Sequence, residues 1–166
     1  MFNSCYRACL KNKENINDTF FRERHIYTFK SNYNRQVYII ECFFRDEFLC
    51  SITFYLKSHR HSPNKYKLKT HLNDFARIIR TCLNVFSNEL KKHPYLSLLI
   101  EAVYSVDEQT NQASKRQRIY IKVLQNFFSP ETFDIIEYKN YILLFNKSNP
   151  HLKDILSEIK LYINKT

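Results

Sequence analysis

The most informative absence in this chain of 166 residues is glycine, which does not occur at all. A protein of this length would on average contain about a dozen. Without glycine, backbone positions in the left-handed region must be taken by Asn or Asp, or be avoided in the fold. Glycine also lets the amides of a loop close around a phosphate, so its absence excludes P-loop and dinucleotide-binding fingerprints. Several large enzyme classes are thereby ruled out.

Long apolar runs and a cysteine framework are missing too. No stretch approaches the roughly 18 uncharged apolar residues of a membrane-spanning helix, and residues 1–15 hold no apolar run of signal-peptide length. We therefore expect a cytoplasmic protein with no membrane partner. The five cysteines are odd in number, and Cys42, Cys50 and Cys82 lie in apolar segments, where a thiol behaves as a small hydrophobe. A disulfide framework is not expected.

Positive charge is what the chain has in excess, with a net charge of +10. Much of it lies in residues 57–80, where seven Lys and Arg face a single acid, Asp74. The basic residues are Lys57, Arg60, Lys65, Lys67, Lys69, Arg77 and Arg80. His59, His61 and His71 add charge when protonated. A concentration of one charge sign in a short stretch is compatible with a polyanionic partner.

The apolar patterning of the first half predicts strands. Residues 1–25 are polar and without a clear period, and we interpret them as an irregular or short helical lead-in to a single domain over 26–166. Three segments rich in β-branched and aromatic residues then predict consecutive antiparallel strands. These segments are 26–31, 36–44 and 48–57.

The second half alternates helices with strands. Apolar residues from Leu72 to Phe86 recur at spacings of three and four, which predicts a long helix capped by Asn73 or Asp74 and ended by His93-Pro94. The remaining expected elements are a buried strand within 95–106, a helix over 116–128, a hairpin over 132–147 that turns at Lys139-Asn140, and an amphipathic helix over 149–165. The order β-β-β-α-β-α-β-β-α predicts an α+β fold, with a mixed, mainly antiparallel sheet of about six strands, two main helices and a C-terminal helix.

This order, with a basic loop before the long helix, resembles the central part of the GNAT acetyltransferase fold. Four segments look like an uncharacterised bacterial family of small GNAT-like proteins: YTFKSNYNRQVYIIECFF, NDFARIIRTCLNVF, YSVDEQTNQASKRQRIYIKVLQNFF and SNPHLKDILSEI. The resemblance covers about residues 26–163. It implies that the fourth and fifth strands of the acetyltransferase fold splay apart to admit the pantetheine arm of acetyl-CoA.

The segment that would hold the cofactor departs from the family's pattern. In acetyltransferases, the amides of a Gly-containing loop before the long helix bind the CoA pyrophosphate, whereas here that loop is KSHRHSPNKYKLKTH, with a proline and no glycine. The superfamily often places a tyrosine that protonates the departing CoA thiolate near the position of Tyr120. The glycine that usually follows in that motif is missing, and Tyr120 is alternatively a packing residue of an amphipathic helix.

The basic loop is the best functional candidate that the residues themselves offer. Lys and Arg side chains attract phosphate without glycine amides, helped by the positive end of the following helix. The candidate anion-binding residues are Lys57, Arg60, Lys65, Lys67 and Lys69 in the loop, with His59 and His61, and Arg116 and Arg118 near the second helix. Alternatively the loop is a solvated surface segment, and Arg116 and Arg118 pair with Asp107 and Glu108 to order the linker.

Three functions fit these observations. The first is a non-catalytic GNAT-like module that binds an anionic ligand or a protein partner through residues 57–70 and 107–118, without a cofactor. The second is an acyl-CoA-dependent N-acyltransferase that holds acetyl-CoA with side chains and uses Glu41, Glu101 or Asp107 as general base. The third is a nucleic-acid-associated accessory protein without base-specific readout.

Two further groups of residues bear on these alternatives. Tyr55 and Tyr66 flank the basic loop and offer aromatic rings for stacking on bases. His59, His61 and His71, and the pair Cys5 and Cys9, do not match common zinc spacings, so no metal site is expected.

Overall fold

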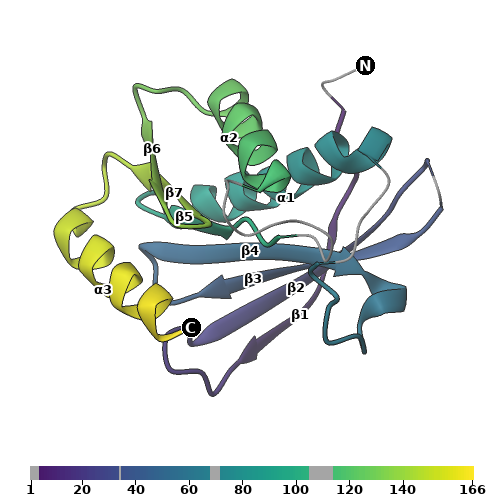
Figure 1. Cartoon of the computed structure of the whole chain (residues 1–166), viewed down its shortest axis with the longest axis horizontal. Coiled ribbons are helices and arrows are strands. Elements are labelled where there is room, and N and C mark those ends of the chain that lie inside the picture. The colour runs from purple at the N-terminus through teal and green to yellow at the C-terminus, as the bar shows by residue number, and fades with distance from the viewer. Residues whose placement is uncertain (1–3, 34, 68–71, 105–113) are drawn as a thin grey trace.

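A computed structural model describes residues 4–33, 35–67, 72–104 and 114–166, with the backbone alone for Leu72 and Asn73. Within these ranges, seven strands form one sheet in the order β1-β2-β3-β4-β5-β7-β6 (Figure 1). The strands are β1 (Cys9–Asn15), β2 (Glu23–Lys30), β3 (Val37–Phe44), β4 (Leu49–Leu56), β5 (Ser97–Glu101), β6 (Phe133–Tyr138) and β7 (Tyr141–Asn146). The helices are α1 (Leu72–Lys92), α2 (Lys115–Phe127) and α3 (Leu152–Lys165), with a short 3-10 helix η1 (Lys57–His59) after β4.

The fold is of the α+β class, as the sequence predicts, and its sheet is mostly antiparallel. Only the neighbours β4 and β5 run parallel in this described sheet. Helices α1 and α2 cover one face, where Ile40, Leu98 and Leu144 join the larger apolar core. Helix α3 covers part of the other face, over Leu99 and Leu143. The alternation of neighbouring strand residues between the two cores follows from the two-residue period of a strand.

The strand β1 is a difference from the sequence-based expectation, which had about six strands and an irregular or helical segment over 1–25. Its sequence CLKNKEN has no β-branched residue, and most of the strand is exposed. The strand forms at the sheet edge because its backbone pairs with β2, with Glu14 opposite Arg24 and in an ion pair with it. Solvated lysines such as Lys11 and Lys13 are typical of such an edge.

The start of α1 also differs in detail from the prediction. The helix begins at Leu72 and ends at Lys92, before His93-Pro94 as expected. The predicted caps Asn73 and Asp74 therefore both lie in its first turn and do not precede the helix. The buried carboxylate of Asp74 accepts hydrogen bonds from the Tyr6 hydroxyl and the Ser31 hydroxyl, both at 2.5 Å. These bonds tie the N-terminal segment and the turn after β2 to the first turn of α1. Of the helices described, none is long and apolar enough to cross a bilayer.

Left-handed backbone positions are taken by residues that the sequence analysis did not expect. Among the described residues, φ is positive at Arg35 (57°) and at Lys139 (54°), so the expectation of Asn or Asp is wrong at these two positions. The hairpin does turn at Lys139-Asn140 as predicted, because Tyr138 pairs with Tyr141. A two-residue turn requires special backbone angles whatever side chains it carries.

Replacing Lys139 by Gly is expected to raise the free energy of unfolding by about 0.5–1 kcal/mol, because Gly has no Cβ to clash at positive φ. The lost contact from Lys139 Nζ to Asn164 Oδ1 is exposed and contributes little. Urea denaturation followed by circular dichroism measures the change. Asn140→Gly is the comparison variant, because φ at Asn140 is not positive; it adds chain entropy and removes the exposed hydrogen bond to Glu101, so it should lower stability. Equal stability of the two variants would contradict the assignment of strain to Lys139.

Candidate anion-binding site

The basic loop, residues 57–67 in the structure, leaves the carboxyl end of β4 as a series of tight turns. It begins with η1, and backbone amides then close successive turns: Ser62 N donates to His59 O at 2.9 Å, and Lys67 N donates to Asn64 O at 2.8 Å. Pro63, between two of these turns, keeps the segment from extending β4 or forming a longer helix. The result is a compact loop at one end of the sheet.

Tyr66 fastens this loop to the sheet. Its hydroxyl donates to Oε2 of Glu41, a residue of the interior strand β3, at 2.7 Å. The backbone carbonyl of Tyr66 accepts from Arg116 Nη1, from the first turn of α2. Lys65 places its ammonium over the rings of Tyr55 and Tyr66, at 4.3 and 4.8 Å from their centroids. Three separate contacts therefore hold the end of the loop that precedes residue 68.

Glu41 is a buried carboxylate with donors on both oxygens. Oε1 accepts from Arg24 Nη1 at 3.2 Å and from the Tyr55 hydroxyl at 3.4 Å, while Oε2 accepts from Tyr66. Only 3% of the residue is exposed. Burial and the neighbouring Glu41 raise the pKa of Tyr55 to about 12 and that of Tyr66 above its usual range. Both hydroxyls thus stay protonated as donors, and Glu41 is committed to holding the loop.

The anchoring leaves several predicted anion-binding residues on the surface. Lys57, Arg60 and Lys67 are exposed, and residues 57–67 contain no acid. Arg60 Nε donates to the imidazole of His61 at 2.8 Å, which leaves its other guanidinium nitrogens for a ligand. Lys65 is half-buried against the tyrosines and contributes charge more than contact. Lys69 lies outside the described residues.

The two arginines predicted to bind an anion near the second helix lie in different surroundings. Arg116 lies beside the basic loop through its bond to Tyr66, so the structure brings together two regions 50 residues apart in sequence. Arg118 is exposed in the first turn of α2, whose N-cap is Ser114. Asp107 and Glu108, the alternative partners of these arginines, lie outside the described residues.

The two strands that the resemblance implicates in cofactor binding, β4 and β5, pair over a short length. Their register covers Leu49 to Ser51 of β4, opposite Ser97 to Leu99 of β5. Beyond this register, the described side chains of β4, β5, α1 and α2 enclose a cavity of about 20 Å³, room for about one water molecule. The cavity is lined by Ile52, Phe54, Ile79, Cys82, Leu83, Leu98, Ile100 and Tyr120.

Tyr120, the predicted catalytic acid of the acetyltransferase alternative, lies in this apolar lining. Its ring stacks on Phe75 with centroids 5.9 Å apart, and only 6% of the residue is exposed. Burial raises the pKa of Tyr120, against a smaller opposing effect of Arg116. A catalytic acid works best with a pKa near the operating pH, so this environment suits packing better than proton transfer.

The general-base candidates are separated by the fold. Glu41 is engaged as described above, and Asp107 lies outside the described residues. Glu101 ends β5, and its carboxyl accepts from Asn140 Nδ2 at 3.4 Å. Loss of hydration raises the pKa of Glu101, although Asn140 and the nearby charge of Lys67 oppose the rise. Glu101 therefore faces the basic loop from the end of β5.

No cluster of three or more His, Cys, Asp or Glu side chains that would suit a metal ion is found in the part of the chain that the structure describes. Cys5 and Cys9 are exposed, and Cys42, Cys50 and Cys82 are buried, as predicted. Burial raises the pKa of these three thiols, which makes them poor nucleophiles.

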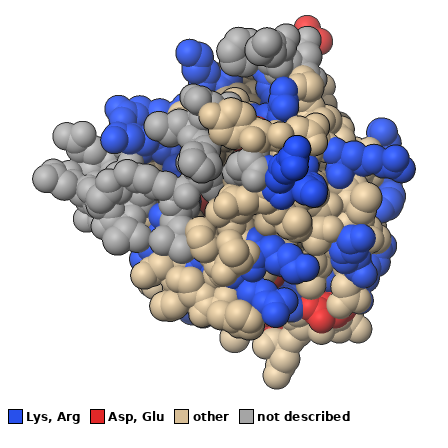
Figure 2. All heavy atoms as spheres, turned by 90° about the vertical axis from the view of Figure 1, so that its right-hand side faces the viewer, with Lys and Arg blue, Asp and Glu red and all other residues tan. Residues whose placement is uncertain are grey.

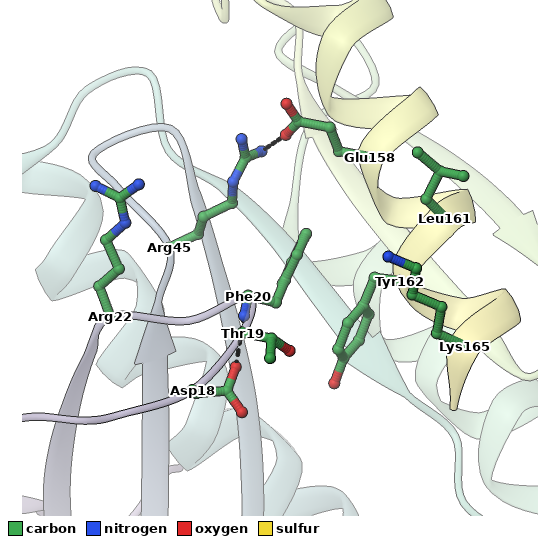
Figure 3. A pocket seen from close by; sticks show the side chains of 9 residues that line it. All are labelled: Asp18, Thr19, Phe20, Arg22, Arg45, Glu158, Leu161, Tyr162 and Lys165. Carbon is green, nitrogen blue, oxygen red and sulfur yellow. Dashed lines mark hydrogen bonds and ion pairs between the residues drawn. The ribbon is translucent and has the colours of Figure 1, made fainter.

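A separate groove of about 330 Å³ runs between the loop before β2 and the end of α3 (Figure 3). Its charged groups serve the fold: Arg45 pairs with Glu158 and lies over the Phe20 ring, which stacks on Tyr162 with centroids 4.5 Å apart. Figure 3 shows Arg22 and Lys165 on opposite sides of the groove, so these two cations do not converge on one anion. The side chains that line this groove thus hold α3 against the sheet. The sequence analysis did not predict this role for them.

Comparison of the chain with protein-family models, with curated proteins and with solved structures gave no match.

Proposed function

We propose that this protein is a non-catalytic module with a GNAT-like architecture that binds a polyanionic ligand through the basic loop. The observation that carries the proposal is the anchoring of the loop by Tyr66, which holds exposed Lys57, Arg60 and Lys67 on a folded surface without a neighbouring acid in the loop. A mobile, merely solvated loop would need no such contacts. Ordered cations bind an anion at a lower entropic cost than disordered ones.

The GNAT-like part of the proposal rests on the sequence resemblance. It is supported by the order of the elements and by a sheet in which only β4 and β5 are parallel among the described strands. The non-catalytic part is supported by the small size of the cavity that the described residues leave beside β4 and β5. A cavity of about 20 Å³ does not admit a pantetheine arm, and Tyr120 is stacked in the core beside it.

Neutralising the exposed cations of the loop is expected to weaken polyanion binding by at least tenfold at low salt. Lys57→Gln combined with Arg60→Gln and Lys67→Gln removes three phosphate contacts and leaves Tyr66 and Glu41 in place. Titration of the protein with fluorescently labelled inorganic polyphosphate at several salt concentrations measures both affinity and the salt slope, which should fall by about three for the triple variant.

The matched control carries three neutralised lysines on α3: Lys153→Gln, Lys160→Gln and Lys165→Gln. It has the same net charge as the loop variant but keeps the loop intact. If both triple variants lose the same affinity, the binding follows net charge and the proposed site is wrong.

The N-acyltransferase is the second candidate, because β4 and β5 pair over only three residues and Tyr120 lies beside the point where pairing ends. The test is a thermal shift with acetyl-CoA at millimolar concentration. Adenosine 3′,5′-bisphosphate, which lacks the pantetheine arm, is the control ligand. If acetyl-CoA raises the melting temperature and this control does not, the pantetheine arm contributes to binding, and the result favours the acyltransferase. An unchanged melting temperature excludes it.

A further inference from the structure

The turn between β2 and β3 lies beside the basic loop, although the two are more than 20 residues apart in sequence. In the sheet, Tyr38 near the start of β3 pairs with Leu56, the last residue of β4, and Lys57 follows directly. Lys30 pairs with Val37, which closes the β2–β3 hairpin at the same end. Figure 1 shows the hairpin tip and the loop after β4 at the right-hand end of the molecule. We call the two segments together, residues 30–33, 35, 36 and 57–67, the basic end.

The basic end carries positive charge and contains no acid, and Glu101, the exposed acid that faces it, lies near Lys67. Lys30 and Arg35 are exposed on the hairpin, as are Lys57, Arg60 and Lys67 on the loop. Neither residues 26–40 nor residues 48–73 contain Asp or Glu. The acids that follow these stretches, Glu41 and Asp74, are both buried. Figure 2 shows this side of the molecule with many Lys and Arg side chains and few Asp and Glu.

One exposed aromatic ring lies among these basic side chains. Tyr33, at the hairpin tip, is 59% exposed. Among the described residues of the basic end, no other large hydrophobic side chain is exposed. Asn32 and Gln36 beside it carry amides that donate and accept hydrogen bonds. A single aromatic with amides and cations suits a stacked base and its phosphates. A membrane surface would call for several apolar side chains, which the described basic end lacks.

We propose that the polyanion is a single-stranded nucleic acid, with a base stacked on Tyr33 and the backbone phosphates following Arg35, Lys57 and Arg60. The inference rests on the proposed function and names its ligand class. Stacking is tolerant of sequence because every base has a π-face, so binding is expected without a strong base preference. Duplexes bind more weakly, because their bases are stacked on one another and closed to Tyr33.

The test is fluorescence anisotropy with 5′-labelled dT12 and rU12 against wild-type protein and Tyr33→Ala at low salt. We expect Tyr33→Ala to weaken binding of both oligonucleotides by about tenfold and to leave the affinity for inorganic polyphosphate unchanged. Tyr33→Phe retains the ring and should bind as wild type. Tyr95→Ala is the matched control, because Tyr95 is also exposed, at 49%, but lies before β5 and away from the basic end. Thermal melts confirm that each variant is folded.

The possible outcomes separate this inference from the proposed function. If polyphosphate binds through Lys57, Arg60 and Lys67 but Tyr33→Ala binds oligonucleotides as tightly as wild type, the inference fails and the proposed function stands. If vesicles of anionic phospholipid bind and dT12 and rU12 do not, the inference is overturned in favour of a lipid surface. If neither polyphosphate nor an oligonucleotide binds, both fail.

Discussion

Replacing Glu89 by Gln is expected to lower the free energy of unfolding by about 3 kcal/mol near pH 6. Glu89 lies in the last turns of α1 and is 1% exposed. Its Oε1 accepts from the Tyr27 hydroxyl and lies 3.4 Å from His25 Nδ1 and 3.3 Å from Lys92 Nζ. Burial alone would raise the pKa of Glu89, but the hydrogen bonds from His25 and Tyr27 lower it from 4.5 to about 2. Such a shift corresponds to about 3 kcal/mol.

The carboxamide of Gln cannot replace this arrangement. Its oxygen is neutral, and its nitrogen would take the place of Oε2, which is buried without a hydrogen-bond partner in the described structure. The variant would therefore bury an unsatisfied donor and also lose the attraction to His25. His25 keeps its contact with Glu23, at 2.7 Å from Nε2, so part of the ion pairing survives.

The pH dependence of this difference follows from the directions of the two pKa shifts. Because the pKa of Glu89 is lowered on folding, its contribution to stability is present above pH 4.5 and is lost as the pH falls toward about 2. Burial opposes the charging of His25, but its bonds to Glu89 and Glu23 raise its pKa above 6.5. The contribution of His25 is complete below pH 6.5 and is lost as the pH rises through the raised value. The wild-type advantage should be largest between about pH 4.5 and 6.5.

Urea unfolding followed by circular dichroism measures these free energies, because the chain has no Trp to serve as a fluorescence probe. Glu131→Gln is the matched control, since this substitution makes the same chemical change at an exposed residue. We expect its stability to stay within about 0.5 kcal/mol of the wild type. Equal unfolding midpoints for Glu89→Gln and Glu131→Gln at pH 6 would show that Glu89 carries no such energy.

The order of most elements could be predicted because its causes are local. The apolar stripe of α1 and the prolines at 94 and 130 stand in the sequence, and the helices end where those residues require. The strand β1 could not be predicted in this way. Its residues favour a loop, and it becomes a strand only because β2 offers a row of backbone groups to pair with.

The candidate site likewise has features that the sequence predicts and features that depend on the tertiary structure. Its charge could be located from the sequence alone, since Lys57, Arg60 and Lys67 lie close together within residues 57–67. The bond from Tyr66 to Glu41 joins residues 25 apart, and the approach of the β2–β3 turn to Lys57 depends on the strand register. A glutamate within the apolar run of β3 was the available signal, because a carboxylate in a buried strand requires partners. The identity of those partners is a tertiary property.

Breaking the bond between Tyr66 and Glu41 is expected to destabilise the protein and to weaken polyanion binding together. In a double-mutant cycle of Tyr66→Phe and Glu41→Gln, we expect a coupling energy of about 2 kcal/mol, typical of a hydrogen bond to a charged group. Tyr138→Phe is the control, because its hydroxyl donates to Asn164 at an exposed site, 3.4 Å away. A coupling energy near zero would mean that the loop is held by Arg116 and Lys65 instead.

The same Tyr66→Phe variant separates two ways in which the basic loop can bind an anion. It keeps every Lys and Arg of the loop, so the number of phosphates contacted and the salt slope of polyphosphate binding should not change. The affinity should nevertheless fall by about three- to tenfold, because a released loop must be ordered when the ligand binds. Lys57→Gln has the opposite signature, a salt slope lower by about one with the anchor intact. If Tyr66→Phe binds polyphosphate as tightly as the wild type, the anchored geometry contributes nothing to recognition, and charge density alone accounts for binding.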